Sequence, residues 1–217
     1  MLFQGDQGIF RTVVSDIVHR NQFGLARGNA ELYNDKKIVR HTTIICEGEG
    51  NKIFFQGKGK VENCHIHIYG SNNIIRIGNG SNVSDATFWI EDDRNEIRIG
   101  KYTSLCGKIE LVCIEGTQID IGDRCLFSSD IVFRSGDSHS VLDSSNRRIN
   151  FSKDIRIGNH VWIGHKVIVN KGTVISDHSV IGTGSVITRQ FHEERIMVAG
   201  NPGRIIKHDI NWAKERK

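Results

Sequence analysis

Between residues 157 and 187 a branched aliphatic residue returns at every sixth position. These positions are Ile157, Ile163, Val169, Ile175, Ile181 and Ile187. The residue that follows each of them is Gly, Asn, Ser or Thr, and the fourth residue after each is mostly Val, Thr or Ser. A period of six fits neither the 3.6-residue period of a helix nor the two-residue period of a simple strand.

The repeat predicts a prism with three flat faces. Each six-residue unit supplies one short strand and one corner, so three units form one coil of about 18 residues. The aliphatic residue points inward and stacks on its equivalents in the neighbouring coils, and the second inward position lies near a corner, where a small side chain fits. Because a single coil cannot bury its own core, the coils must stack with parallel strand pairing.

The same frame reappears upstream at Ile77, Ile99 and Ile121 and loses its phase between these blocks. We therefore expect loops or irregular coils at residues 85–98, 107–120 and 134–156, the last of them projecting from the prism. The predicted organisation is a cap segment at residues 1–50, a β-helix domain at 51–207 and a tail or short helix at 208–217. Residues 1–40 are compatible with two alternatives. A helix would place five apolar residues on one face, and strands would instead cap the open end of the prism; the apolar residues are Phe10, Val13, Val14, Ile17 and Val18.

Composition supports an all-β chain in a reducing compartment. The 217 residues include 23 glycines and a single proline. The five cysteines form no C-x-x-C pair and are odd in number, which is typical of free thiols in a cytoplasmic protein. Most of them are expected to fill the core. No apolar run is long enough for a membrane helix, and no signal peptide is recognisable. The net charge of +4 carries no dense basic tract, so nucleic-acid binding is not expected. The charge either helps to collect an anionic partner or is ordinary surface charge.

Three segments resemble the signature blocks of hexapeptide-repeat acyltransferases. They are Ile157–Gly164 (IGNHVWIG), Gly184–Arg189 (GSVITR) and Ala199–Lys207 (AGNPGRIIK). Within that family, Asp137-Ser138-His139, Arg148-Ile149-Asn150 and Lys153-Asp154 resemble the capsular polysialic acid O-acetyltransferases, although Ser140 stands where that group often has proline. The resemblance implies a left-handed parallel β-helix, a homotrimer with active sites in grooves between subunits, and acetyl-CoA as the acyl donor. The implied acceptor is a sugar hydroxyl on sialic acid or another surface polysaccharide.

His139 is the predicted general base. An imidazole with an ordinary pKa near 6.5 suits proton transfer at neutral pH, and no metal is needed to displace a thiolate. The histidine lies in the predicted projecting segment, at the place of the family's catalytic histidine. Asp137, or one of Glu193 and Glu194, is the candidate to orient its ring.

Trp162 falls at an outward position of its unit, where a bare indole is unfavourable unless something covers it. The resemblance implies that it lines the active-site groove and that its backbone N–H helps to bind the oxyanion. The resemblance also implies a set of residues that bind coenzyme A; they are Gly164, His165, Thr183, Thr188, Arg189, Arg204 and Lys207.

Three alternatives stay open at this point. His160 and His165, together with His139, resemble the three-histidine zinc site of γ-class carbonic anhydrases, although the spacing from His139 is short. Related transferases acetylate the nitrogen of a nucleotide-linked amino sugar instead of a hydroxyl. A β-helix without enzymatic activity is the third alternative, which the joint presence of His139, Trp162 and the coenzyme A blocks disfavours.

Overall fold

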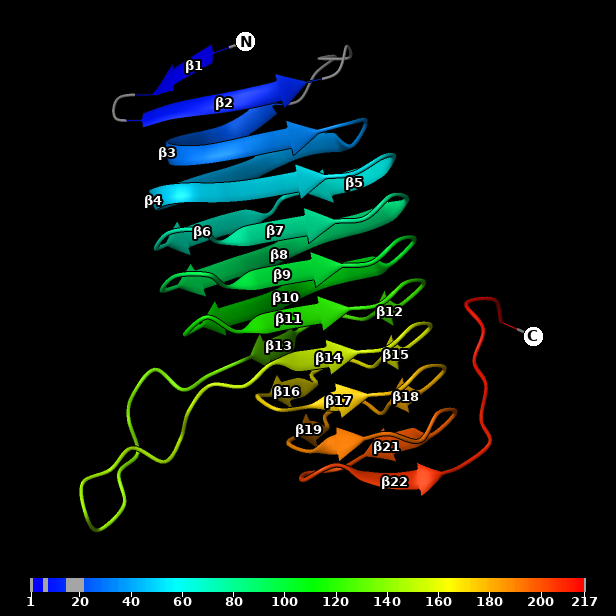
Figure 1. Ribbon diagram of the computed structural model, residues 1–217. Helices are drawn as coiled ribbons and strands as arrows, with labels where there is room; N and C mark the ends of the chain where they lie inside the picture. Colours follow the sequence, from blue (N-terminus) through cyan, green and yellow to red (C-terminus); the bar gives the residue numbers. More distant parts are fainter. Residues whose placement is uncertain (1, 6–7, 15–21, 217) are drawn as a thin grey trace.

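The computed structural model describes residues 2–5, 8–14 and 22–216, and all of their regular structure is β-strand. The strands wind into a parallel β-solenoid of about 7 turns. In Figure 1 the chain runs from left to right along the front strands and returns behind them while it descends, which makes the coil left-handed. The predicted all-β hexapeptide-repeat fold is confirmed.

Three faces build the prism, and we number them by the strands that they contain. Face 1 holds β7 (Ile74–Ile77), β9 (Glu96–Ile99), β11 (Gln118–Ile121), β14 (Ile155–Ile157), β17 (Val174–Ile175) and β20 (Gln190–Phe191). Face 2 holds β5 (Gly59–Glu62), β12 (Leu126–Phe127), β15 (Trp162–Ile163), β18 (Val180–Ile181) and β21 (Met197–Ala199). Face 3 holds β6 (His65–Tyr69), β13 (Ile131–Arg134), β16 (Ile168–Asn170) and β19 (Val186–Ile187).

The remaining strands bend around the corners or close the ends. β8 (Ser81–Glu91) and β10 (Ser104–Ile114) run from face 2 onto face 3, and β4 (Ile38–Phe55) contributes to all three faces. Next to β4 lies β3 (Gln22–Asn34), which pairs in parallel with β2 (Gly8–Val14). Antiparallel pairs form both ends of the sheet, β1 (Leu2–Gly5) with β2 and β22 (Arg204–Lys207) with β21.

Three columns of turns separate the faces. Corner A joins face 1 to face 2 at residues 100–103, 122–125, 158–161 and 176–179. Corner B joins face 2 to face 3 at residues 128–130, 164–167 and 182–185, and corner C joins face 3 to face 1 at residues 92–95, 171–173 and 188–189. Because each coil repeats the last, residues at equivalent turns stand in a column along the solenoid axis.

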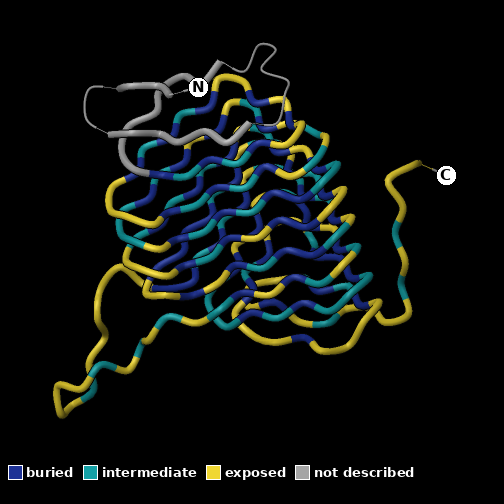
Figure 2. Tube along the Cα trace, turned by 45° about the horizontal axis from the view of Figure 1, so that its top comes forward, coloured by how far each residue is buried: buried dark blue, intermediate teal, exposed yellow. Residues whose placement is uncertain are grey.

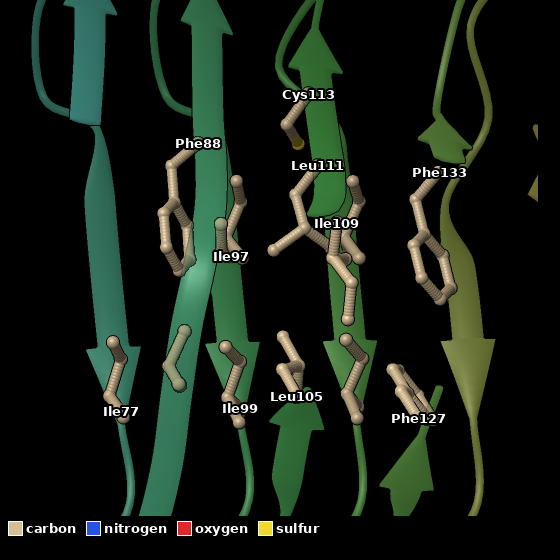
Figure 3. Close-up of a cluster of buried hydrophobic side chains, with 14 of the residues drawn as sticks. Ile77, Phe88, Ile97, Ile99, Leu105, Ile109, Leu111, Cys113, Phe127 and Phe133 are labelled. Carbon is tan, nitrogen blue, oxygen red and sulfur yellow. The ribbon is translucent and has the colours of Figure 1, made fainter. Parts of the chain in front are cut away.

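The six-residue ladder lies inside the prism, as the repeat predicts. Ile157 pairs with Ile175, Ile163 with Ile181 and Val169 with Ile187, and each of these side chains is buried. Burying one such side chain contributes roughly 1.5–3 kcal/mol. Figure 2 shows that buried residues recur along the coloured coils, and Figure 3 shows how isoleucine, leucine and phenylalanine side chains pack together in the interior.

Of the two alternatives for residues 85–98 and 107–120, the structure has coils and not loops. These residues form β8, β9, β10 and β11, in coils whose equivalent residues are 22 apart, whereas the C-terminal coils repeat after 18. Face 3 carries the additional length, because it holds one more inward row, formed by Cys46, Ile68, Ile90 and Cys113. The longer third side breaks the six-residue phase without breaking the coil. At residues 135–154 a projecting loop does occur (Figure 1).

Corner C of the longer coils holds a ladder of buried asparagines. The Oδ1 atom of Asn51 accepts the backbone N–H of Asn73 at 2.9 Å, and Oδ1 of Asn73 accepts the backbone N–H of Asn95 at 2.8 Å. Asn95 in turn accepts from the N–H of Thr117 at 3.1 Å. Each amide nitrogen donates to a corner carbonyl, as Asn73 does to Asp92 at 3.0 Å. The ladder therefore satisfies backbone groups that a sharp buried turn would otherwise leave unpaired.

The cysteines are free, and four of the five are buried. Burial raises the pKa of the Cys64 and Cys113 thiols to about 11 and that of Cys125 to about 12. Thiols with such values hold almost no thiolate at neutral pH, so these residues fill the core, as expected, and are unsuited to nucleophilic chemistry.

Both ends of the chain refine the sequence-based expectations. Phe10, Val13 and Val14 lie in β2, so a strand replaces the alternative of a helical face there, while Ile17 and Val18 lie outside the described residues. Parallel pairing begins with β2 and β3, upstream of residue 51. Residues 208–216 form an extended tail without helix. No helix of the length and hydrophobicity that crossing a bilayer requires is present in the described residues.

We predict that Asn73→Ala destabilises the solenoid by about 1–3 kcal/mol, because it leaves the buried Asn95 N–H without a partner and removes the bond from Asn73 Nδ2 to the Asp92 carbonyl. Asn82 is exposed on face 2, so Asn82→Ala is the matched control and should change stability by less than about 0.5 kcal/mol. Urea denaturation followed by circular dichroism measures both. Equal midpoints for the two variants would contradict a structural role of the ladder.

Candidate active site

The predicted base, His139, lies in the projecting loop between β13 and β14. The loop turns back on itself through a bridge between Leu142 and Arg148, and a single carboxylate, that of Asp143, accepts the N–H groups of its tip. The Nδ2 atom of Asn150 donates to the backbone carbonyl of His139 at 2.8 Å. The backbone of His139 is therefore fixed, while its side chain is exposed and no described residue forms a hydrogen bond with its ring.

Asp137 anchors this loop rather than orienting the imidazole of its own chain. Its Oδ2 atom accepts from Lys171 Nζ at corner C and from Asn150 Nδ2. These bonds, that from Lys171 first, lower the pKa of the Asp137 carboxyl. Lys171 also donates to the carbonyl of Asn150 at 2.8 Å, so one ammonium group ties both ends of the loop to the solenoid. Of the other predicted orienting carboxylates, Glu193 contacts His208 at 2.6 Å.

Trp162 points outward from β15, as its place in the repeat predicts, and its side chain is 41% exposed. It stands in a row of outward residues on face 2, between Leu126 and Val180. The predicted oxyanion role of its backbone N–H is not supported, because that N–H donates to the carbonyl of Ser179 at 3.0 Å. The backbone N–H of Trp162 is therefore engaged in the parallel sheet, and its indole is the part of the residue that a ligand can contact.

The residues predicted to bind coenzyme A fall on two neighbouring corners and the last strand. Gly164, His165 and Thr183 meet at corner B, where a Cβ atom on Gly164 would lie 2.8 Å from the Thr183 nitrogen. A glycine is thus required for the two coils to approach. His165 is held by Ser129, whose hydroxyl lies 2.9 Å from its Nδ1 atom.

The other predicted coenzyme A ligands lie further along the same end of the solenoid. Thr188 and Arg189 are exposed at corner C, and Arg204 and Lys207 are exposed on β22. Among the described residues, no carboxylate forms an ion pair with any of these three cations. Unpaired cations on an open surface are available to a phosphorylated ligand.

His139 and Trp162 do not meet within one chain. The loop that carries His139 leaves the solenoid at corner C, whereas Trp162 lies on face 2, between corners A and B. Figure 1 shows the loop at the lower left and β15 on the right of the molecule. One chain therefore presents the two predicted groups of the site on different sides.

Another tryptophan, Trp212, lies next to Trp162, and no sequence motif predicts it as a site residue. Trp212 belongs to the C-terminal tail, stacks on the ring of His160 with centroids 4.3 Å apart, and lies 6.2 Å from Trp162. Its Nε1 atom donates to the His160 carbonyl at 2.8 Å. The only sequence signal for this contact is a lone indole in an otherwise polar tail.

The three histidines of the zinc alternative occupy separate places. His160 lies at corner A beside His178, His165 lies at corner B, and His139 lies on the loop. In the part of the chain that the structure describes, no three potential ligands converge on one point. Burial, His178 and Arg124, in that order, lower the pKa of His160.

Comparison with known proteins agrees with the fold. The family model for bacterial transferase hexapeptide repeats (six repeats) matches residues 154–189. A polysialic acid O-acetyltransferase of Neisseria meningitidis is 29% identical over 179 residues, which cover 82% of this chain and 82% of that protein. A second one, of Escherichia coli O1:K1 / APEC, is 34% identical over 124 residues, or 57% of this chain, and the match spans only 40% of that relative's length.

A solved structure is similar over most of the fold. The crystal structure of a polysialic-acid-specific acetyltransferase is 30% identical, with a TM-score of 0.66, over 82% of this chain and 91% of its own. The solenoid and its six-residue repeats define a hexapeptide-repeat protein. The chain belongs to the hexapeptide-repeat acetyltransferase family and is similar to its polysialic acid O-acetyltransferases. Other members of the family have been crystallised with acetyl-CoA or coenzyme A.

We predict that Lys171→Met loosens the loop and raises the rate of its cleavage at Arg147 by roughly threefold to tenfold. Arg147 is exposed, so an arginine-specific protease reports how often the loop opens. Lys166→Met removes an exposed lysine at corner B and should leave the rate unchanged.

The same anchor should depend on pH only in acid. Because the folded-state pKa of Asp137 lies below its ordinary value of 3.8, the contribution of the ion pair is complete above about pH 4. It is lost as the pH falls through the lowered pKa. Equal cleavage rates for both lysine variants at pH 7 would show that the Asp137–Lys171 contact does not hold the loop.

Proposed function

We propose that the chain transfers an acetyl group from acetyl-CoA to a hydroxyl group of a sugar, in sialic acid or another acidic surface polysaccharide. The observation that carries the proposal is the combination of an exposed loop imidazole, an outward Trp162 and open cations around corners B and C, on a solenoid similar to polysialic acid O-acetyltransferases. The mildly basic net charge of +4 suits an anionic acceptor.

The chemistry follows from the groups present. The His139 imidazole takes the proton of the acceptor hydroxyl while its oxygen attacks the thioester carbonyl. The tetrahedral intermediate then collapses, the carbon–sulfur bond breaks, and the imidazolium returns a proton to the departing thiolate. Because the N–H of Trp162 is engaged in the ladder, its indole supplies a wall of the site, and the oxyanion requires another donor.

A homotrimer completes the site in this proposal. The loop exposes four apolar side chains at 50–60%, namely Val141, Leu142, Ile149 and Phe151. A solvent-exposed apolar cluster of this kind favours contact with another protein surface. Docking of the loop on a neighbouring copy would bring His139 of one subunit toward Trp162 of the next, which a single chain does not achieve. The free cysteines support a cytoplasmic location.

We predict that His139→Ala lowers kcat by about 10²–10⁴, the range for loss of a general base, without changing the assembly state. Acetyl-CoA consumption with oligosialic acid as acceptor measures the rate, and light scattering measures the assembly. His41 is exposed and lies in β4, near the N-terminal end of the solenoid, so His41→Ala is the control. Full activity of His139→Ala would remove the proposed base.

Mixed assemblies test whether the site is shared. If His139→Ala and Trp162→Ala chains are produced together, a neighbour can combine an intact loop with an intact tryptophan. Random mixing should then restore about a quarter of the wild-type activity from two chains that are each inactive alone. No recovery in mixed assemblies would show that both groups act within one chain.

Arg189→Ala should raise the KM for acetyl-CoA several-fold while it changes kcat by less than about twofold, because the side chain contacts only the part of the donor remote from the thioester. Arg94→Ala removes an equally exposed arginine from corner C of a longer coil and should leave both constants unchanged. Steady-state kinetics at varied acetyl-CoA concentration measures kcat and KM for both variants. A fall in kcat without a change in KM would place Arg189 in the chemical step.

A further inference from the structure

The C-terminal tail returns along corner A instead of leaving the molecule. After β22 the chain runs back toward the N-terminal coils, as the red segment on the right of Figure 1 shows. Contacts tie it down at regular intervals: His208 to Glu193 at 2.6 Å, Ile210 N–H to the Arg195 carbonyl at 2.8 Å, and Trp212 Nε1 to the His160 carbonyl at 2.8 Å. The tail is therefore a strap with a defined course over the solenoid.

Trp212 is the central feature of this strap. Its indole is nearly parallel to the His160 ring, at 12°, and it meets Trp162 at a tilt of 44°. Because the ring is fixed by stacking and by its N–H, it forms a rigid aromatic wall beside the outward row of face 2.

A pocket of about 440 Å³ opens between the strap and the solenoid. Its floor includes Ser104 and Leu126, which precede Trp162 in the same outward row of face 2. The pocket thus lies directly on the N-terminal side of the predicted catalytic tryptophan. The volume falls within the range of small-molecule sites and suits one or two sugar rings.

The corner A side chains of the pocket stand in one column. Tyr102, Arg124 and His160 occupy equivalent turns of successive coils, and all three have left-handed backbone angles, with φ of 57°, 57° and 53°. Such turns favour Gly, Asn or Asp, since a bulky side chain is strained there. Left-handed angles recur at other corners of the solenoid, for example at Arg94 and Lys166, so the angle fixes how the side chains of the column project and does not by itself mark a site.

The charges of the pocket favour an anion. Arg124 and Lys214 line it together with one carboxylate, Glu215. Among the described residues none forms an ion pair with Arg124, although its side chain is exposed at the rim. A guanidinium presents paired donors that match a carboxylate, and the aromatic rings offer a flat apolar surface for the carbon face of a pyranose.

We propose that this pocket is the acceptor subsite, in which Arg124 binds the carboxylate of an acidic sugar and Trp212 packs against its ring. The inference rests on the proposed acetyl transfer, because it places the acceptor hydroxyl next to Trp162. The donor is expected elsewhere, since the predicted coenzyme A residues lie at corners B and C and on β22, on the other side of Trp162. Acceptor and donor thus approach the tryptophan from opposite sides.

Direct binding tests the subsite independently of catalysis. Wild-type protein without acetyl-CoA is titrated with tetrameric oligosialic acid, and with maltotetraose as a neutral probe, by isothermal calorimetry. We expect oligosialic acid to bind and maltotetraose to bind at least tenfold more weakly. Arg124→Gln and Trp212→Ala should each raise the Kd for oligosialic acid at least tenfold, and the Kd for coenzyme A should stay within twofold.

The matched control is Arg94→Gln. Arg94 is also exposed and has a left-handed backbone, with φ of 61°, but it lies at corner C. The variant should leave both dissociation constants unchanged. Circular dichroism and light scattering on Trp212→Ala verify that the fold and the assembly survive. If the tail detaches in Trp212→Ala, the Arg124→Gln result still tests the subsite, because Arg124 lies on the solenoid.

The outcomes separate this inference from the proposed function. Oligosialic acid that binds equally well to Arg124→Gln and wild type, or does not bind at all, overturns the subsite even if acetyl transfer to another sugar is found. A loss of coenzyme A affinity in step with oligosialic acid affinity also overturns it, because the pocket would then hold the nucleotide. Selective loss of oligosialic acid binding supports the subsite even where no acetyl transfer is measured, a result that would count against the proposed reaction alone.

Discussion

Parallel pairing between equivalent residues of successive coils is the constraint on which the rest of the molecule depends. Each inward isoleucine or valine is covered only by its counterparts one coil away, and each corner has to satisfy its backbone groups in the same register. The asparagine ladder at corner C and the aliphatic ladder inside the faces therefore enforce the same alignment. Once it is fixed, every corner becomes a column of side chains with a predictable spacing.

These columns decide what the surface can do. Corner A stacks Tyr102, Arg124 and His160, corner B brings His165 next to Ser129 and the coil of Thr183, and corner C holds Lys171 under the base of the loop. None of these neighbours is close in sequence. A rigid scaffold of this kind holds functional side chains in place without a large reorganisation when a ligand binds.

The sequence predicts the strictly repeated coils well and the longer ones poorly. From Ile157 to Ile187 both the inward residues and the prism follow from spacing alone. The six-residue repeat does not predict the upstream coils, because a longer face 3 moves the next aliphatic residue out of phase. The recurrence of Asn51, Asn73 and Asn95 at intervals of 22 residues is the sequence signal that indicates these coils. A search for one fixed period misses a repeat in which one side of three has a different length.

The sequence names candidate site residues but not their contacts. The motifs single out His139, Trp162 and Asp137, and the exposure of the histidine and the indole fits their predicted roles. The engagement of the Trp162 N–H with Ser179 and of Asp137 with Lys171 depends on which coil lies next to which. Trp212 lies farther still from any sequence pattern, because its position follows from the course of a tail that returns over several coils.

The straightness of the solenoid has a last consequence for the site. The loop leaves the prism at corner C and Trp162 lies on face 2, so His139 and Trp162 of one chain lie on different sides of the molecule. The tail, in contrast, reaches face 2 of its own chain, where Trp212 lies next to Trp162 and lines a pocket together with Leu126. In the proposed assembly each site then receives its base from one subunit and its aromatic walls and acceptor pocket from the next. Recognition of the acceptor and activation of its hydroxyl are therefore encoded on separate copies, and association itself brings the two functions together.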